Sequence, residues 1–239
     1  MMDLQNKVAI ITGASSGIGE ATARELDAAG MNLVLTARSE DKLNKLAASL
    51  THATFVAGEV SHPELPKRLL EEALSSFGRA DALVNNAGVM VVGTVETVDI
   101  EALCQMVRIN VEAAFRMAYV FARHFKQHAN GFIVNLSSIS GTTNYPTMAA
   151  YCGSKHAIES FTDCLRLELA GSGVGVGCVE PGKVATNLYQ NWSEEEKQMV
   201  AIEQPLVAED IARGIRFLLQ QPSNVNIGRL LITPANQSA

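Results

Sequence analysis

The sequence predicts an α/β protein with a doubly wound, mostly parallel sheet of seven strands, covered by helices on both faces in three layers. Three observations favour this fold class. Short apolar runs rich in β-branched residues recur along the chain, and helix-patterned segments of roughly 12 to 25 residues separate them. No repeat or Pro/Ser-rich linker interrupts this alternation, so we expect residues 1–239 to form a single domain with a large core.

The strand candidates are near-continuous apolar runs, which is typical of strands buried on both faces of a parallel sheet. Helical segments separate the first six, and the seventh lies near the end of the chain. The candidates are Lys7–Thr12, Asn32–Ala37, Ala53–Ala57, Asp81–Asn85, Gly131–Ser137, Gly173–Glu180 and Arg229–Thr233.

Two helical segments carry residues of later importance. Ile100–Gln127 is predicted as one long helix or as a short helix joined to a long one, and the other segment spans about 149–170. Residues 183–205 have no strand pattern and are expected to form a mobile flap. Asn110 interrupts the apolar stripe of the first segment, which is formed by Val107, Val111, Ala114, Phe115, Ala118 and Phe121.

Composition excludes several classes of protein. The chain is 47% apolar and 18% charged, as ordinary globular proteins are, and its net charge of −6 argues against nucleic acid as a partner. No apolar run approaches the length of a membrane span, which is about 18 residues. The first residues of the sequence are polar and lack the layout of a secretory signal. The four cysteines lack the spacing of a zinc site or a disulfide scaffold. We therefore expect cytoplasmic residence, no membrane association and no metal site.

A glycine-rich turn follows the first strand. Residues Thr12–Gly19 read T-G-A-S-S-G-I-G and lead directly into the helical segment Glu20–Ala29. Backbone amides at a helix start bind anions, and glycines let a pyrophosphate approach closely. The spacing is G-x-x-x-G-x-G, and a turn without a ligand is the alternative. We expect a Rossmann-like dinucleotide site with contacts from Gly13, Ser15, Ser16, Gly17, Ile18 and Gly19.

The end of the second strand indicates which dinucleotide fits. An acidic side chain there binds the ribose hydroxyls of NAD, whereas a cation binds the 2′-phosphate of NADP. The sequence is Leu35-Thr36-Ala37-Arg38-Ser39, which has no carboxylate and offers a guanidinium suited to bidentate phosphate binding. This pattern predicts NADP(H), with a solvated Arg38 as the alternative. The missing acid also counts against a methyltransferase.

Tyr151 and Lys155 are four residues apart on a predicted helix, so they lie on the same face. A phenol has an ordinary pKa of about 10 and is a poor acid-base catalyst at neutral pH. An ammonium about 4 Å away would stabilise the phenolate by roughly 4 kcal/mol at an effective dielectric of about 20. The pair is therefore a candidate for proton transfer, with a surface pair at helical spacing as the alternative.

These motifs together resemble the short-chain dehydrogenase/reductase family, in its short single-domain branch. Thr12–Gly19 looks like the family's cofactor turn, Asn85–Gly88 like its motif after strand four, and Tyr151–Lys155 like its Y-x-x-x-K signature. Asn135–Gly141 is similar to the strand-five segment, and 181–186 to the loop on the nicotinamide side. The resemblance covers nearly the whole sequence.

The resemblance implies roles for four catalytic residues, Asn110, Ser138, Tyr151 and Lys155. Tyr151 would give a proton to the developing alkoxide in reduction and remove it in oxidation. Lys155 would lower the pKa of the phenol and hold the nicotinamide ribose, and Ser138 would donate a hydrogen bond to the substrate oxygen. Asn110 would position a water that relays protons to Lys155. A turn-capping Ser138 and a core Asn110 satisfied by backbone are the alternatives.

The resemblance also implies further cofactor contacts. Glu59-Val60 stands where many relatives carry Asp-Val to hold the adenine, so Val60 is assigned and the contact of Glu59 stays open. The other expected contacts lie near the ribose or the nicotinamide: Asn86, Ala87, Gly88, Tyr151, Lys155, Pro181, Gly182, Val184 and Thr186.

The implied activity is hydride transfer between NADP(H) and a small alcohol or hydroxy acid and its aldehyde or ketone. The resemblance further implies a homodimer or homotetramer formed through the helices of Asn110 and Tyr151. One alternative is a non-catalytic NADP-sensing regulator of the same fold, which would be expected to have lost Ser138, Tyr151 or Lys155. The other is an epimerase or dehydratase of the extended branch, which would need a larger C-terminal part.

Overall fold

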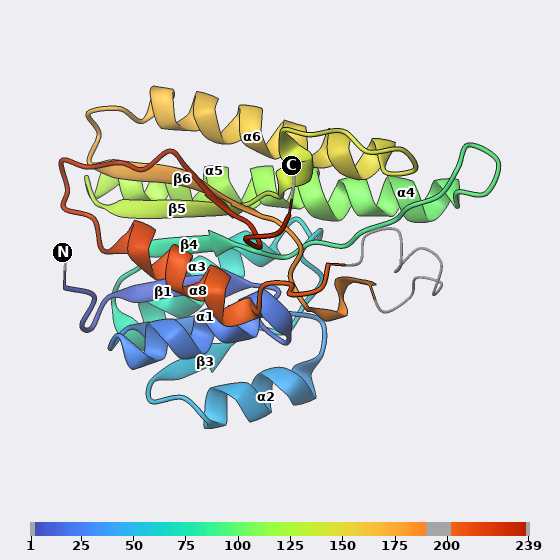
Figure 1. Cartoon of the computed structure of the whole chain (residues 1–239). Helices are drawn as coiled ribbons and strands as arrows, with labels where there is room; N and C mark the ends of the chain where they lie inside the picture. Colours follow the sequence, from blue (N-terminus) through green and yellow to red (C-terminus); the bar gives the residue numbers. More distant parts are fainter. Residues whose placement is uncertain (1–2, 190–201, 238–239) are drawn as a thin grey trace.

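The strands of the protein form one seven-stranded sheet in the order β3-β2-β1-β4-β5-β6-β7 (Figure 1). The structure is a computed structural model that describes residues 3–189 and 202–237. All six pairings between neighbouring strands are parallel, so the predicted fold class is confirmed. The strands are β1 Val8–Thr12, β2 Asn32–Thr36, β3 Ala53–Phe55, β4 Ala82–Asn85, β5 Gly131–Leu136, β6 Val174–Pro181 and β7 Arg229–Ile232.

The chain winds outward from the middle of the sheet in two directions. β1 pairs with β2 on one side and with β4 on the other, so Ala9 lies between Leu33 and Ala82. The connections after β1 and after β4 therefore leave the carboxyl edge of the sheet in opposite directions. This reversal creates the crevice in which doubly wound proteins bind their ligands.

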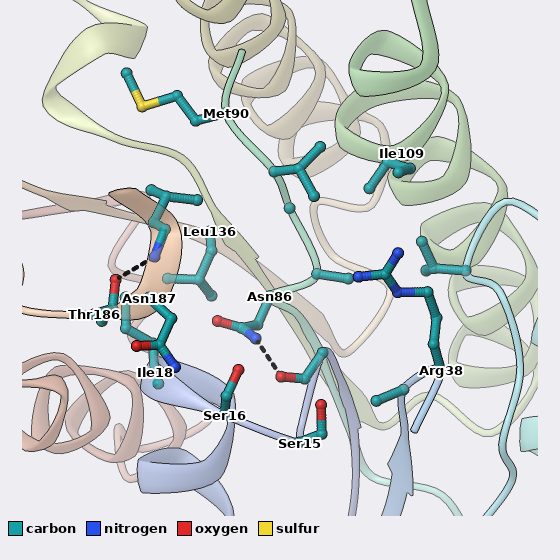
Figure 2. A pocket seen from close by; sticks show the side chains of 18 of the residues that line it. Ser15, Ser16, Ile18, Arg38, Asn86, Met90, Ile109, Leu136, Thr186 and Asn187 are labelled. Atoms are coloured by element: carbon teal, nitrogen blue, oxygen red, sulfur yellow. Dashed lines mark hydrogen bonds between the residues drawn. The ribbon is translucent and has the colours of Figure 1, made fainter. Parts of the chain in front are cut away.

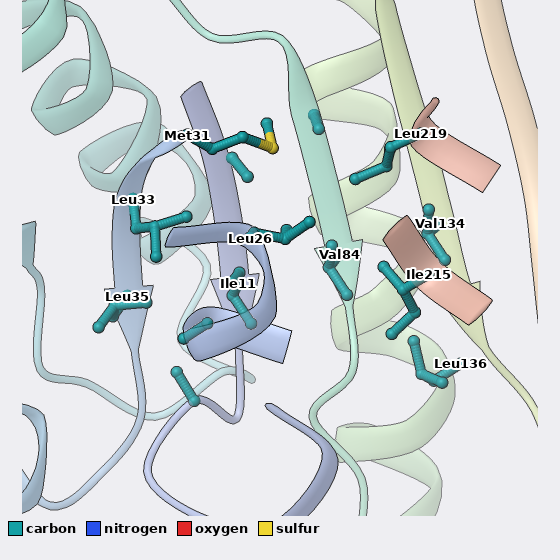
Figure 3. Close-up of a cluster of buried hydrophobic side chains, with 14 of the residues drawn as sticks. Ile11, Leu26, Met31, Leu33, Leu35, Val84, Val134, Leu136, Ile215 and Leu219 are labelled. Atoms are coloured by element: carbon teal, nitrogen blue, oxygen red, sulfur yellow. The ribbon is translucent and has the colours of Figure 1, made fainter. Parts of the chain in front are cut away.

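Helices cover both faces, and the five central strands contribute side chains to two hydrophobic cores, one on each face. On β1, Ile11 packs with Leu26 and Ile215 under α1 and α8 (Figure 3), whereas Ile10 packs with Phe121 under α5. None of the helices among the described residues has the length and apolar character to cross a bilayer. The helices are α1 Gly17–Ala28, α2 Glu40–Ala48, α3 Leu65–Phe77, α4 Ile100–Val107, α5 Ala113–Gln127, α6 Ala149–Glu168 and α8 Ala208–Leu219.

The segment from α4 to α5 is continuously helical but contains a π-helical turn, η1 Arg108–Glu112. The turn inserts an extra residue, so the apolar stripe predicted from a regular helical period is offset by one residue at its start. Met106 is buried, whereas Val107 is 39% exposed. Asn110 lies inside the π turn and is buried. Later in the segment, Phe121 is buried as predicted.

The predicted flap, residues 183–205, falls partly outside the described residues, which exclude 190–201. Its two ends lie side by side. Ala185 N donates to Leu206 O at 2.8 Å, and Leu206 N donates to Lys183 O at 2.9 Å. Residues 183–185 and Leu206 therefore lie together, shortly after the end of β6.

Candidate active site

A cavity of about 710 Å³ opens at the carboxyl edge of the sheet, where the chain reverses direction between β1 and β4 (Figure 2). In Figure 2, Ser15 and Ser16 lie at its floor, and Arg38 and Thr186 lie on opposite sides. The cavity brings together most of the predicted site residues, namely Gly13, Ser15, Ser16, Gly17, Ile18, Arg38, Val60, Asn86, Ala87, Gly88, Tyr151, Lys155, Pro181 and Thr186.

The turn between β1 and α1 leaves helix amides open toward the cavity. Gly17 begins α1 with a φ of +55°. Ser16 caps the helix by position but forms no side-chain hydrogen bond to the first turn, all of which the structure describes. A Cβ on Gly19 would lie 2.3 Å from Gly13 O and 2.6 Å from Asn86 Nδ2. Gly19 therefore packs behind the turn and does not line the cavity, and the open amides can hold an anion.

The loop after β4 is fixed across the end of β1. Thr12 Oγ1 accepts hydrogen bonds from the backbone N–H groups of Asn86 and Ala87, both at 3.0 Å. Asn86 Nδ2 donates to Thr12 O at 2.8 Å. These bonds hold Ala87 and Gly88 against the cavity, opposite the glycine turn.

Charged groups gather beyond the end of β2. Arg38 Nε lies 3.8 Å from Glu59 Oε1, and the two side chains are 72% and 52% exposed. Such an exposed ion pair contributes little to stability, so another anion can replace Glu59. Ser39 and Lys42 also line the cavity, and neither was predicted from the sequence. The signal for Lys42 was its place four residues after Arg38, at the start of α2.

Tyr151 and Lys155 lie one turn apart on α6, and both line the cavity. They are 6% and 7% exposed. Lys155 Nζ donates to Leu136 O at 2.9 Å and lies 5.8 Å from the centroid of the Tyr151 ring. Burial lowers the pKa of Lys155 to about 8, against the smaller opposing effects of Cys178 and Glu159. The amine therefore remains mostly charged at neutral pH.

Asn110 joins the π turn to the loop after β4. Its Nδ2 donates to Val89 O and its Oδ1 accepts from Val89 N, both at 2.9 Å, and Nδ2 also lies 3.3 Å from Ser154 Oγ. A Cβ on Gly88 would lie 3.4 Å from Asn110 Oδ1 and 3.8 Å from Lys155 Nζ. Asn110 does not line the cavity itself; its amide is satisfied largely by backbone, and Asn110 and the Lys155 amine both border Gly88.

Three other predicted residues do not line the cavity. Ser138 caps the short helix η2 Ile139–Gly141, because its Oγ accepts from Ser140 N at 3.1 Å, and it also lies 3.5 Å from Pro181 O. Gly182 N donates to Ile232 O at 2.8 Å, so this glycine faces β7. The Val184 side chain is buried in the core.

Fold and cavity together are those of a dinucleotide-binding class of α/β protein, with a tyrosine-lysine pair lining the cavity. The chain belongs to the short-chain dehydrogenase/reductase family, since the family model described as short chain dehydrogenase matches residues 7–197. It is an oxidoreductase of this family, whose members use nicotinamide cofactors.

Relatives of the chain match it over its full length. An uncharacterized oxidoreductase of Staphylococcus saprophyticus is 32% identical, with 100% of both chains covered. Another of Listeria innocua is 31% identical, with 99% of both covered.

Solved structures of the same fold include enzymes with different cofactors bound. An alcohol dehydrogenase of Thermococcus sibiricus complexed with 5-hydroxy-NADP has a TM-score of 0.86 and 28% identity, covering 98% of both chains. A 3-ketoacyl-(acyl-carrier-protein) reductase of Brucella melitensis complexed with NADH also has a TM-score of 0.86, with 29% identity and coverage of 96% of this chain and 97% of that one. A serine dehydrogenase complexed with NADP⁺ has a TM-score of 0.91 at 24% identity, covering 97% of this chain and 96% of its own, which is a likeness of fold alone.

Proposed function

We propose that this chain is an NADP(H)-dependent enzyme that interconverts a small alcohol or hydroxy acid and the corresponding aldehyde or ketone. The observation that carries the proposal is the composition of one cavity. It is lined by the open helix start, by Arg38, and by Tyr151 beside Lys155. Hydride transfer to a carbonyl needs a nicotinamide site and a proton donor in one place, and this cavity offers residues for both.

The residues present fit NADP(H). The amides at the start of α1 and the glycines beside them would hold the pyrophosphate, because the turn has space and no competing cap. Arg38, Ser39 and Lys42 would hold the 2′-phosphate, with Arg38 exchanging Glu59 for it. When bound, the nicotinamide supplies or accepts the hydride. The alcohol dehydrogenase of the same fold, complexed with 5-hydroxy-NADP, supports this choice, and the reductase complexed with NADH is the reason to test it.

Tyr151 is proposed as the general acid in reduction and the general base in oxidation. Its hydroxyl proton passes to the carbonyl oxygen as that oxygen becomes a hydroxyl, and the reverse holds for oxidation. The Lys155 ammonium is 5.8 Å from the ring centroid, a distance at which it would stabilise a phenolate by about 3 kcal/mol at an effective dielectric of about 20. Ser138 would donate to the same oxygen by giving up its long contact of 3.5 Å with Pro181 O.

The substrate is proposed to be compact and weakly polar. Met90, Ile109 and Leu136 line the cavity (Figure 2), and so do Val89 and Leu188. Apolar walls with few polar groups favour small and weakly polar substrates. The polar contacts to the substrate would then come from Tyr151, which lines the cavity, and from Ser138 once its hydroxyl turns from Pro181 O toward the cavity.

We propose that the protein is a single domain that resides in the cytoplasm. We also propose that it forms a homodimer or homotetramer through a contact on α5 and α6. Apolar side chains there are only half covered: Tyr119 is 44% exposed and Leu167 is 66% exposed. Phe115 stacks on Phe161 between the two helices at 4.0 Å. Exposed apolar surface of this kind suits a symmetric contact between copies. Size-exclusion chromatography with light scattering tests it, and a monomer at micromolar concentration would contradict it.

A screen of aldehydes, ketones, hydroxy acids and alcohols, followed by NADPH absorbance, tests the proposed function. We expect turnover of small substrates, with kcat/KM for NADPH at least about tenfold above that for NADH because of the cations beyond β2. Comparable efficiencies with the two cofactors would contradict the NADP assignment. Tight NADPH binding without turnover of any substrate would favour the regulatory alternative.

A further inference from the structure

A buried acidic cluster lies behind the cavity and has no part in the proposed chemistry. Glu159 on α6 and Glu180 on β6 are each 4% exposed, and Cys178 between them in sequence is fully buried. Cys178 Sγ donates to Glu159 Oε1 at 3.3 Å. Arg229 Nε, on β7, lies 3.7 Å from Glu159 Oε2 and 3.9 Å from Glu180 Oε1.

The cation beside these carboxylates does not neutralise both. Arg229 is 45% exposed and makes its hydrogen bond to a third carboxylate, Asp163, at 2.9 Å. Glu159 Oε2 and Glu180 Oε1 are buried and receive no hydrogen bond within the part of the chain that the structure describes. Buried carboxylate oxygens without a donor are costly, so the cluster lacks a donor at the point where the two glutamates meet.

A proton held by one of the two carboxyl groups provides the missing hydrogen-bond donor. The two carboxyl groups are within hydrogen-bonding reach of each other, and burial together with the Glu159 carboxylate raises the pKa of Glu180 to about 7. Two carboxylates that share one site hold one proton between them and titrate as a pair. The pair then carries one negative charge, and both orphaned oxygens are satisfied.

The pair also joins two elements of the active site. Glu159 lies one helical turn after Lys155 on α6, and Glu180 directly precedes Pro181, which lines the cavity. Glu159 raises the pKa of Lys155 against the effect of burial. Cys178 cannot do so at neutral pH, because burial raises the pKa of its thiol well above the usual value and leaves it uncharged.

We propose that Glu159 and Glu180 form a proton-sharing acid pair that positions the active site. The pair ties α6 at Lys155 to the end of β6 at Pro181 and provides the negative charge that balances the Lys155 ammonium. The other ionisable groups that face it are Asp163 from α6, Cys178 from β6 and Arg229 from β7. The effect on turnover rests on the proposed function, whereas the shared proton does not.

The shared proton is tested through stability, without cofactor or substrate. The folded chain should hold a proton that the unfolded chain releases between pH 4.5 and about 7, so wild-type stability falls as pH rises through this range. Glu180→Gln keeps a donor and removes the titration. We expect the unfolding constant of wild type, divided by that of E180Q, to rise roughly 70-fold between pH 5 and pH 8 in urea unfolding. A ratio that stays constant with pH overturns the proposal.

Asp163→Asn is the matched control for that measurement. Asp163 lies one turn further along α6 and bonds the same Arg229, but its side chain is 37% exposed. We expect the unfolding constant of wild type, divided by that of D163N, to change far less between pH 5 and pH 8, because Asp163 is open to water. If D163N and E180Q give the same pH dependence, the effect comes from Arg229 and the acid pair is refuted.

The positioning role is tested with single and double variants. In E159Q or E180Q the remaining carboxylate keeps the charge of the pair, and the new amide keeps the hydrogen bond. The double variant loses the negative charge of the pair. The pKa of Lys155, which burial already lowers to about 8, should then fall further, because no nearby carboxylate stabilises the ammonium. We expect the double variant to bind NADP⁺ at least about twofold more weakly at pH 7 by calorimetry, and its alkaline limb of kcat/KM to move about one pH unit lower.

The loss of NADP⁺ binding free energy in the double variant should clearly exceed the sum of the losses in the two single variants. Additive losses, together with an unmoved alkaline limb of kcat/KM, would refute the positioning role. If the double variant does not fold, Glu180→Ala is compared with Glu180→Gln, and only the alanine should weaken NADP⁺ binding. Equal binding by these two variants would overturn the positioning role as well. If the protein turned over no substrate, the unfolding ratio and the NADP⁺ titrations would still test the acid pair.

Discussion

Replacing Lys155 with methionine should leave the protein about as stable as wild type while removing most of its activity. Methionine is close to lysine in length, is apolar and adapts to a buried site. The wild-type residue is 7% exposed, and its ammonium donates a hydrogen bond to Leu136 O at 2.9 Å. The variant loses this bond and also escapes the cost of burying a charge.

The two effects nearly cancel. Burial lowers the pKa of Lys155 from its ordinary 10.5 to about 8. At about 1.4 kcal/mol for each pKa unit, the buried charge costs about 3 kcal/mol of folding free energy at neutral pH, whereas a charged hydrogen bond contributes about 1.5 to 3 kcal/mol. The free energy of unfolding should therefore rise by about 0 to 2 kcal/mol. Loss of an ammonium 5.8 Å from the Tyr151 ring should cost about 3 kcal/mol in the transition state, or roughly 100-fold in kcat/KM.

Urea unfolding at several pH values, with kcat/KM measured beside it, checks this balance. Between pH 8 and 10.5 the folded wild type binds fewer protons at Lys155 than the unfolded chain, so wild-type stability should rise with pH relative to the variant. The reasoning is refuted if K155M is destabilised by more than about 2 kcal/mol at pH 7, or if the difference between the two proteins is independent of pH.

Two further substitutions probe the cofactor side of the cavity. Arg38→Ala should weaken NADP⁺ binding about tenfold or more in calorimetry and barely change NAD⁺ binding, since the guanidinium faces only the 2′-phosphate in the proposal; equal losses would contradict it. Gly19→Ala should weaken both dinucleotides and lower stability by about 1 to 3 kcal/mol, because the new Cβ would lie 2.3 Å from Gly13 O. Gly153→Ala, a helix position with nothing within 4 Å of a Cβ, is the control and should cost no stability.

Local patterns predicted the sheet and the cofactor turn well. Each strand overlaps an apolar run of the sequence, because the central strands are buried on both faces and must be apolar throughout. The glycine turn, Arg38 and the Tyr151-Lys155 pair meet in one cavity because they all sit at carboxyl ends of strands or on the helix that packs beside them. Their sequence spacing already contained that information.

Features that depend on tertiary contacts were not predictable in the same way. The π turn around Asn110 shifts the helix face by one residue, and a regular helical period cannot anticipate it. The sequence suggested no contact between Glu59 and Arg38, which follow different strands and meet only when β2 and β3 are neighbours. The pairing of Glu159 with Glu180 likewise requires α6 to lie on β6.

Activity of Tyr151→Phe tests the central claim most directly. The substitution removes only the hydroxyl of a residue that is 6% exposed, so the fold and the cavity should be retained. The account predicts that Y151F binds NADPH with nearly wild-type affinity and loses at least about a thousandfold in kcat with any substrate that the wild type turns over. Wild-type turnover by Y151F would contradict the account, because the phenol would then have no role in moving the proton.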